Sequence, residues 1–302
     1  NTISSYSYSY DDAGNILSVT SGGVTTSYTY DSQNQLLSET KGGVTASWSY
    51  DAAGNITSKT KGGVTDTYTY GNSEWTDLLT AYNGNTISYD MIGNPTVWYD
   101  GSTFTWSNGR QLTSITNTPS GDNVSYQYMA DGRRIQKTVG STTTKFTWVG
   151  DRLVTTYKTG GQCIEYYYDE NGKPSGFYIQ PASGQSYVQY YYVTNLQGDV
   201  TGILDANGTL VGSYEYNAWG EITSITGDIA QVNPIRYRGY YFDEETGFYY
   251  LGSRYYDPEI CRFVNADSYA STGQDFVGYN MFAYCLKNPI QFIDNRGISP
   301  LN

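Results

Sequence analysis

The chain has 302 residues, including 34 Tyr and 34 Gly, and it contains no His. Without His, the chain cannot form a Ser-His-Asp triad, a Cys-His pair or a His-ligated zinc or haem site. Its three widely spaced cysteines allow at most one disulfide and cannot form a Cys₄ zinc site. The net charge of −12 and the pI near 4.3 disfavour binding to nucleic-acid phosphates. We therefore expect no metal, no cofactor and no nucleic-acid partner.

The sequence also lacks features of membrane insertion and targeting. No apolar run approaches the roughly 18 residues of a membrane span. The chain has no starting Met, signal peptide or lipidation motif, and it opens at Asn1 in strand-like alternation. We expect it to be a piece of a longer protein.

A repeat of 20 residues organises the first 70 residues. Such a period indicates one supersecondary unit that has been copied along the chain. Three features keep this spacing: a Tyr-Asp pair at positions 10, 30 and 50, a Gly-Gly-Val-Thr run at positions 22, 42 and 62, and a Gly-Asn-Ile run at positions 14 and 54.

Each repeat is predicted to be a two-stranded hairpin. Residues 24–30 alternate large and small polar side chains, which is typical of a strand with one buried face. Residues 31–34 are turn formers, and we expect Asp31 to accept hydrogen bonds from backbone amides there. Residues 36–40 form the return strand, and Gly42 and Gly43 form the next tight turn.

Beyond residue 70 the period loosens, but Tyr-Asp-like and Gly-Asn or Gly-Arg pairs persist. The chain therefore reads as one continuous antiparallel β-structure, and residues 275–286 are its one candidate for a helix.

The C-terminal part of the chain contains several distinctive motifs. They are Tyr-Arg-Gly-Tyr-Tyr-Phe-Asp at 237–243, Arg-Tyr-Tyr-Asp-Pro at 254–258, Arg-Phe-Val-Asn-Ala-Asp at 262–267, and Asp-Asn-Arg-Gly at 294–297. Together with the repeats, these motifs resemble the Rhs/YD-repeat family, and the match to its Rhs-associated core domain is the more specific. We therefore expect regular repeats (1–70), degenerate repeats (71–189) and a core domain (190–302).

The resemblance implies an all-β fold, in which antiparallel hairpins form a strip that spirals into a hollow shell, or part of one, closed by the core domain. In toxin members the shell encloses a C-terminal toxin. The implied partners are therefore this effector cargo and upstream or partner shell segments. The implied location is secreted or at the surface of a bacterial cell.

The resemblance further implies one intramolecular cut just after the core domain, and its motifs place the catalytic residues at Arg254, Asp267 and Asp294. Physically, two close carboxylates cannot both ionise cheaply, so one holds a proton while the other activates water. A nearby Arg would stabilise the ionised partner or polarise the scissile carbonyl. The alternative is structural: Asp294 caps a turn and Asp267 is an exposed loop acid.

The chain departs from the family motif at two positions that could affect this site. Ser268 and Asn295 stand where the family has Pro, and the interval between the two Asp residues is longer than expected, with the surplus near residues 271–274. Because Pro stiffens a turn, its loss could leave a slow or inactive protease. Because the implied cut is intramolecular, any enzymatic activity is at most one turnover per chain.

Two other functions compete with the shell. Aromatic repeats can form cages for sugars or quaternary ammonium groups, and residues 166–168 and 190–192 are all Tyr. Such a surface- or carbohydrate-binding module would have no catalytic activity. An aspartic protease acting on other proteins is the other alternative. The motifs from Arg254 onward favour the shell.

Overall fold

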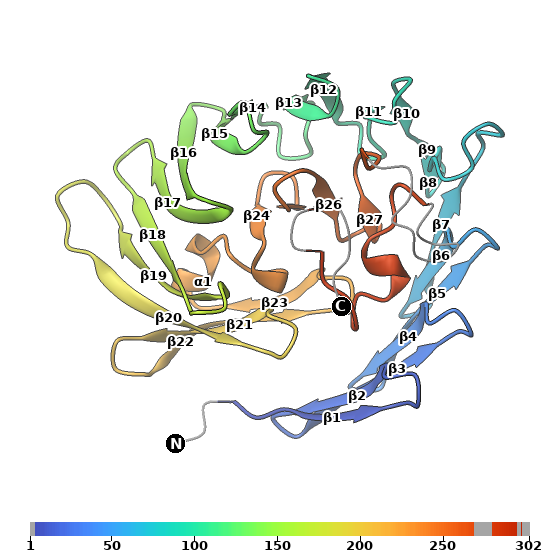
Figure 1. Cartoon of the computed structure of the whole chain (residues 1–302), viewed down its shortest axis with the longest axis horizontal. Helices are drawn as coiled ribbons and strands as arrows, with labels where there is room; N and C mark the ends of the chain where they lie inside the picture. The colour runs from blue at the N-terminus through green and yellow to red at the C-terminus, as the bar shows by residue number, and fades with distance from the viewer. Residues whose placement is uncertain (1–3, 269–279, 295–296, 298–302) are drawn as a thin grey trace. The chain divides into compact units, whose positions relative to one another are not determined.

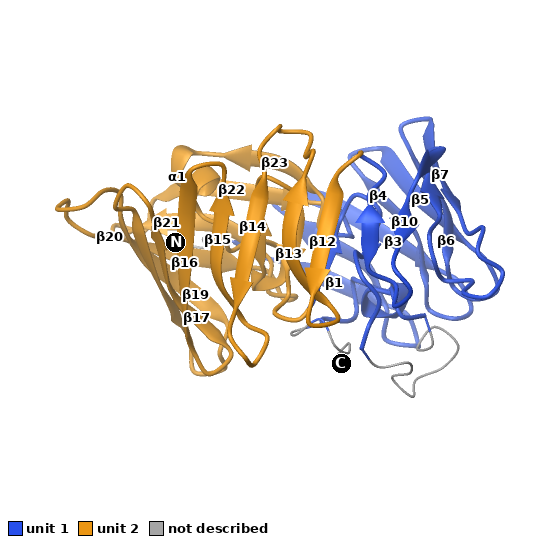
Figure 2. Ribbon diagram, turned by 90° about the horizontal axis from the view of Figure 1, so that it is seen from above, with its two compact units in different colours: residues 1–100, 217–219, 254–302 blue, residues 101–216, 220–253 orange. Residues whose placement is uncertain are grey.

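The computed structural model describes residues 4–268, 280–294 and 297. They form antiparallel sheets, which confirms the predicted all-β class (Figure 1). The chain divides into two compact units: unit 1 contains residues 1–100, 217–219 and 254–302, and unit 2 contains residues 101–216 and 220–253 (Figure 2). The predicted division at residue 70 rests on the regularity of the repeats and that at residue 189 on the resemblance to the core domain, and both stay predictions.

Unit 1 contains a nine-stranded sheet in which each strand pairs with its sequence neighbours, followed by short hairpins. Its elements are β1 (Ser7–Tyr10), β2 (Ile16–Ser21), β3 (Val24–Tyr30), β4 (Leu36–Lys41), β5 (Val44–Tyr50), β6 (Ile56–Lys61), β7 (Val64–Thr69), β8 (Ala81–Tyr82), β9 (Asn85–Thr86), β10 (Ser88–Tyr89), β11 (Pro95–Val97), β26 (Tyr255–Asp257), β27 (Arg262–Phe263) and the 3₁₀ helix η3 (Cys285–Lys287).

The predicted hairpins are confirmed, with the expected turn chemistry. Lys41 pairs with Val44, so Gly42 and Gly43 alone make the turn between β4 and β5. Both have positive φ, of 59° and 79°, as a two-residue hairpin turn with the native twist requires. At the other end of the hairpin, the Oδ1 atom of Asp31 accepts the backbone N–H groups of Gln33 and Gln35, as predicted.

The motif tyrosines connect successive repeats. The hydroxyl of Tyr30 donates to the carbonyl of Ile16 at 2.7 Å, and that of Tyr50 donates to the carbonyl of Leu36 at 2.6 Å. In both cases the acceptor lies 14 residues earlier, in the Gly-Asn-Ile position of the preceding repeat. The same bond joins Tyr128 to Leu112 in unit 2. Tyr30 and Tyr50 thus each fix their own hairpin to the one before it.

Replacing Tyr50 by Phe is expected to lower the free energy of unfolding by about 1 kcal/mol, because the Leu36 carbonyl loses its hydroxyl donor. Tyr10→Phe is the matched control: Tyr10 occupies the same motif position but is 52% exposed. Urea unfolding followed by tryptophan fluorescence measures both. Equal stability of Tyr50→Phe and wild type would contradict this role of the motif hydroxyl.

In unit 2, the strands from β12 to β23 also pair with their sequence neighbours. Its elements are β12 (Thr103–Ser107), β13 (Gln111–Thr116), β14 (Val124–Tyr128), β15 (Arg134–Val139), β16 (Thr142–Val149), β17 (Arg152–Lys158), β18 (Cys163–Tyr168), β19 (Pro174–Gln180), β20 (Val188–Thr194), β21 (Val200–Asp205), β22 (Leu210–Tyr216), β23 (Ile222–Thr226), α1 (Asp228–Val232), the 3₁₀ helix η1 (Tyr237–Gly239), β24 (Tyr241–Asp243) and β25 (Phe248–Tyr250).

One face of the unit 2 sheet forms an aromatic core. Phe177 is fully buried and packs against Tyr190 and Tyr192, at ring-centroid distances of 5.2 and 5.4 Å. Tyr191, between them in sequence, points to the opposite face and is 39% exposed. The Tyr-rich runs therefore supply alternate residues to the core, as strand geometry dictates.

The structure adds one helix that the sequence did not predict, α1, which packs on β22. Of the predicted helix at 275–286, residues 275–279 lie outside the described residues, and residues 280–284 are not helical. The expected surplus near 271–274 also lies outside them. Among the described residues, no helix has the length and apolar character needed to cross a membrane.

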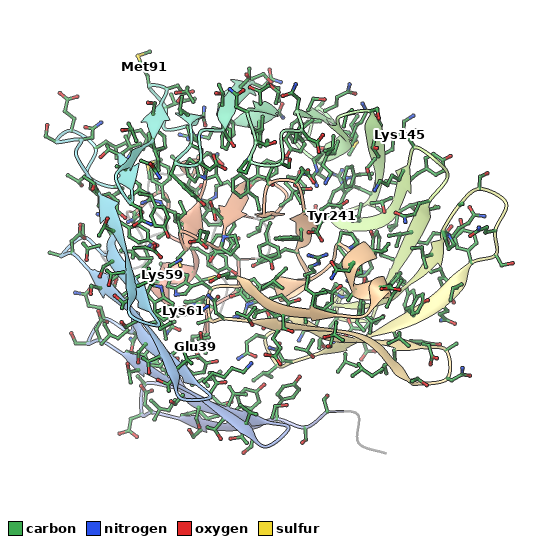
Figure 3. The ribbon with its side chains drawn as sticks, turned by 180° about the vertical axis from the view of Figure 1, so that it is seen from behind. Glu39, Lys59, Lys61, Met91, Lys145 and Tyr241 are labelled. Atoms are coloured by element: carbon green, nitrogen blue, oxygen red, sulfur yellow. The ribbon has the colours of Figure 1, made fainter. Side chains whose placement is uncertain are left out.

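Among the large apolar side chains at the surface, Met91 projects from its turn and is 98% exposed (Figure 3).

Candidate functional site

A short hairpin in unit 1 positions two of the three predicted site residues. In it, Tyr256 of β26 pairs with Phe263 of β27. Arg254 immediately precedes β26, and Asp267 lies a few residues beyond β27. The backbone N–H of Asp267 donates to the carbonyl of Met281 at 2.8 Å, which holds this segment against a later part of the core.

The structure brings Arg254, Asp267 and Asp294 together. The Nη2 atom of Arg254 lies 2.8 Å from Oδ2 of Asp267 and 3.7 Å from Oδ2 of Asp294. The three residues are 5%, 6% and 1% exposed, respectively. Two buried carboxylates therefore share one guanidinium. The alternative that Asp267 is an exposed loop acid is wrong, because its side chain is buried and paired.

Gly297 is held by two members of this trio. Its N–H donates to Oδ1 of Asp294 at 2.6 Å, and its carbonyl accepts from Nε of Arg254. Asp294 thus does cap the turn, as the structural alternative expected, but it also faces Arg254. The chain at Gly297 therefore lies against the Asp294 carboxylate and the Arg254 guanidinium, which in turn pairs with Asp267.

Repeat asparagines bind the core segment of unit 1. The side-chain amide of Asn280 donates to Oδ1 of Asn55 at 2.7 Å, and that of Asn288 donates to Oδ1 of Asn15 at 3.0 Å. Asn15 and Asn55 each belong to a Gly-Asn-Ile run. Two of these runs therefore each supply an acceptor for the segment that leads to Asp294.

Unit 2 contains a second group of buried charges. Arg134 and Asp243 are both fully buried, with Nη1 of Arg134 2.6 Å from Oδ2 of Asp243. Lys137 lies 2.7 Å from Asp243 and 3.0 Å from Glu245. Burial opposes ionisation of Asp243, but Arg134 and Lys137 outweigh it and hold the pKa of Asp243 below its ordinary value. Burial, reinforced by Asp243, raises the pKa of Glu245.

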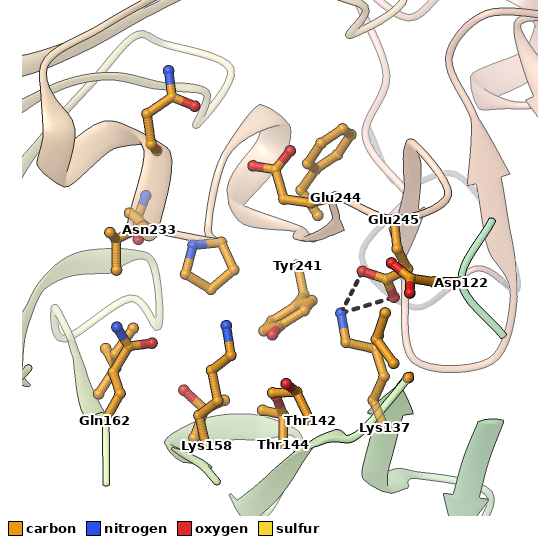
Figure 4. A pocket seen from close by; sticks show the side chains of 18 of the residues that line it. Asp122, Lys137, Thr142, Thr144, Lys158, Gln162, Asn233, Tyr241, Glu244 and Glu245 are labelled. Carbon is orange, nitrogen blue, oxygen red and sulfur yellow. Dashed lines mark hydrogen bonds and ion pairs between the residues drawn. The ribbon is translucent and has the colours of Figure 1, made fainter. Parts of the chain in front are cut away.

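A polar cavity of about 610 Å³ borders this group (Figure 4). Lys137 and Glu245 lie on its wall with their ion pair intact, and Tyr241 of β24 also lines it. The wall carries both signs of charge, since Lys158 and Asp122 also line it. The balanced charges and the internal ion pairs are typical of a structural network.

The chain matches the family model described as the teneurin YD-shell over residues 25–281. The chain belongs to this family. The predicted resemblance to Rhs/YD-repeat proteins is thus confirmed. The match includes Arg254 and Asp267, whereas Asp294 lies beyond it.

Two curated relatives of this YD shell are large proteins. The tRNA3(Ser)-specific nuclease WapA of Bacillus spizizenii is 37% identical over 230 residues, which cover 72% of this chain and 9% of that protein. The double-stranded DNA deaminase toxin A of Burkholderia cenocepacia is 26% identical over 255 residues, covering 74% of this chain and 17% of that protein. The chain therefore spans less than a fifth of either relative.

A solved structure shares the fold of this YD shell. The Tc holotoxin pore of Photorhabdus luminescens matches with a TM-score of 0.80 and 20% identity, over 99% of this chain and 17% of that one. At this identity, the comparison establishes the fold alone.

Sequence reasoning missed two groups that surround Arg254. The guanidinium carbon lies 3.5 Å from the ring centroid of Phe263, and Nη1 donates to the carbonyl of Met281 at 3.1 Å. Phe263 follows Arg262 in the core motif, and pairing with Tyr256 places it beside the Arg254 segment. A hairpin register for residues 255–263 could have located the ring. The backbone carbonyl of Met281 leaves no signal in the sequence.

Lys287 offers a pH-dependent test of the YD-shell core. The residue is 2% exposed, and burial together with the nearby Arg262 lowers its pKa to about 7. An unfolded Lys titrates near 10.4, so between pH 7 and 9 the unfolded state binds more protons and the stability rises with pH, by up to about 1.4 kcal/mol per unit.

Lys287→Met is expected to remove this rise, so that the gain in unfolding free energy between pH 7 and 9 is about 2 kcal/mol smaller than in wild type. Urea titrations at both pH values measure the difference. Lys145→Met, at an exposed lysine, is the control and should follow wild type. A Lys287→Met protein with the wild-type pH dependence would refute the assignment.

Proposed function

We propose that the chain is a segment of a YD shell that encloses a downstream effector, and that its core domain cuts the chain once, shortly after Gly297. The observation that carries the proposal is the buried contact of Arg254 with Asp267 and Asp294, with Gly297 bonded to Arg254 and Asp294. In this proposal residues 190–302 act as the core domain, and the shell works at the cell surface or after secretion.

The chemistry of the cut follows from the carboxylates. One of the two groups is ionised and the other protonated at the start. A water molecule held between them attacks a peptide carbonyl, while the ionised carboxylate takes a proton from the water and the protonated carboxyl group supplies a proton to the leaving nitrogen. Arg254 would stabilise the negative charge that develops on the carbonyl oxygen. The cut needs no His, which suits a chain that has none.

The names of the relatives support a cargo partner. One relative is named as a tRNA nuclease and another as a DNA deaminase toxin. Both contain a segment that is similar to this chain. A common segment joined to different activities fits a container better than an enzyme that acts on outside substrates. The partners in this proposal are the effector and neighbouring shell segments, with no role for nucleic acid bound by the shell itself.

The proposed enclosure is tested by expressing the chain with its natural flanking segments and adding a broad-specificity protease. An enclosed effector should stay with the shell on gel filtration and resist digestion for as long as the shell does. The same effector expressed alone is the control and should be digested quickly. An effector that is degraded equally fast in both samples would count against enclosure.

The carbohydrate-binding alternative has less support. The Tyr-rich runs on which it depends contribute buried residues to the core, such as Tyr166, which is 6% exposed. The hydroxyl of Tyr168 donates to the Leu153 carbonyl and is therefore already bonded within the protein. On the exposed face, Tyr167 contacts Tyr178 and Tyr191, with centroids 5.5 and 6.2 Å apart. Most of these rings therefore serve packing.

A further inference from the structure

Arg254 makes polar contacts along its edge, and its guanidinium lies over an aromatic ring. Its edge atoms contact Asp267, Asp294, Met281 and Gly297. One face of the guanidinium lies over the ring of Phe263, at 3.5 Å from the centroid. This distance is well within the range of about 6 Å at which a cation is attracted by an aromatic face.

Phe263 is itself fixed in place. It is fully buried, and its ring meets the rings of Tyr256 and Tyr284 edge-on at 6.0 and 5.7 Å. Its backbone N–H donates to the carbonyl of Phe282 at 3.1 Å. A ring held from these directions cannot tilt away from Arg254 without disturbing the core of unit 1.

This arrangement limits the freedom of the guanidinium. The N–H donors of a guanidinium lie in its plane, so its faces cannot form hydrogen bonds. When the group is buried, an aromatic ring can stabilise such a face. The aromatic face offsets part of the cost of burying the charge, and the Met281 carbonyl fixes the direction of Nη1. Nε and Nη2 are thereby aimed at Gly297 and at the carboxylates.

We propose that Phe263 is a positioning residue for the self-cleavage reaction: its ring holds Arg254 in the orientation that serves Asp267, Asp294 and the chain at Gly297. This proposal rests on the proposed function, since it assigns Phe263 a part in that cut. Phe263 acts through Arg254, whose guanidinium lies over its ring.

The rate of cleavage tests the role of the ring. The chain with its natural downstream segment is produced by cell-free translation, and the half-time of cleavage is read from the intact mass of the products. Phe263→Leu keeps an apolar side chain but removes the aromatic face, and is expected to cut about 10- to 30-fold more slowly. Phe177→Leu removes an equally buried ring that packs on tyrosines, and should cut at the wild-type rate.

Fluorinated phenylalanines at position 263 separate the electrostatic role from packing. Each added fluorine weakens the negative face of the ring with little change in shape, so the rate should fall stepwise from phenylalanine to its difluoro and trifluoro forms. Wild-type rates for Phe263→Leu or for the trifluoro form would overturn the proposal. Equal slowing of Phe263→Leu and Phe177→Leu would also overturn it.

A structural readout keeps this proposal distinct from the proposed function. If wild type never cuts, the proposed function fails, and the crystal structure of Phe263→Leu still decides the role of the ring. We expect Arg254 to leave Asp267 and Gly297 in that variant. Arg254 in its wild-type position without the ring would overturn the proposal, whether or not the chain is cut.

Discussion

Asp267→Asn and Asp294→Asn are each expected to slow self-cleavage by about 100- to 10,000-fold, the range typical of losing a general acid or base. Asn cannot exchange a proton with water or with the leaving nitrogen, although it fills nearly the same space. In the proposed cut one group accepts a proton and the other supplies one, so neither can replace the other. The readout is the fraction of cut chain with time, by intact mass.

Two further variants define the specificity of this effect. Asp12→Asn changes an exposed turn acid far from the site in sequence and should cut at the wild-type rate. Arg254→Lys keeps the positive charge but loses Nε and the planar face, so it should also cut slowly. Normal cutting by either Asp267→Asn or Asp294→Asn would show that the carboxylates do not act as a pair.

Asp243→Asn is expected to lower the free energy of unfolding by about 3–5 kcal/mol, the cost of removing one partner of a buried ion pair. Asp243 is fully buried, and its carboxylate is bonded to both Arg134 and Lys137. Asn leaves these two cations without their main counter-charge. The aromatic rings around Arg134, among them Tyr250 at 4.4 Å, supply only part of the lost stabilisation.

Chemical denaturation measures this loss, with Asp131→Asn as the control. Asp131 pairs with Arg133 at the surface, next to Arg134 in sequence, so its removal should leave the unfolding curve unchanged. Replacing Arg134 by Met and Asp243 by Leu together should cost less than Asp243→Asn alone, since no charge of that pair is left unmatched. A stable Asp243→Asn protein would contradict a structural role for the buried pair.

The hairpins could be predicted because their determinants are local. A two-residue Gly-Gly turn and alternation along residues 24–30 fix the strand register within one repeat, and β3 begins and ends where expected. The bond of Asp31 to the amides of its turn is equally local. These features require only the period of the strand and the φ values that Gly allows.

The buried ion pair could not be predicted, because its determinants are far apart. Arg134 follows an Asp-Gly-Arg turn and reads as a surface residue, yet its partner Asp243 lies 109 residues later in the chain. Nothing within the repeat indicates that this arginine, rather than Arg133, turns inward. Only the fold brings the two residues together.

The candidate site could be predicted from the sequence only in part. Its three residues came from the resemblance to core-domain motifs, and the structure places them in contact, with Ser268 following Asp267 where the family has Pro. The ring of Phe263 and the Met281 carbonyl were missed, since they belong to the packing around Arg254. Motifs thus identified the charged residues, and the fold revealed what orients them.

The most direct test of the account is the intact mass of the wild-type chain expressed with its natural downstream segment. We predict two fragments, with the new end shortly after Gly297, and one uncut product for Asp267→Asn and Asp294→Asn. A wild-type chain that stays whole under the same conditions would contradict self-cleavage and leave the YD shell as a passive container.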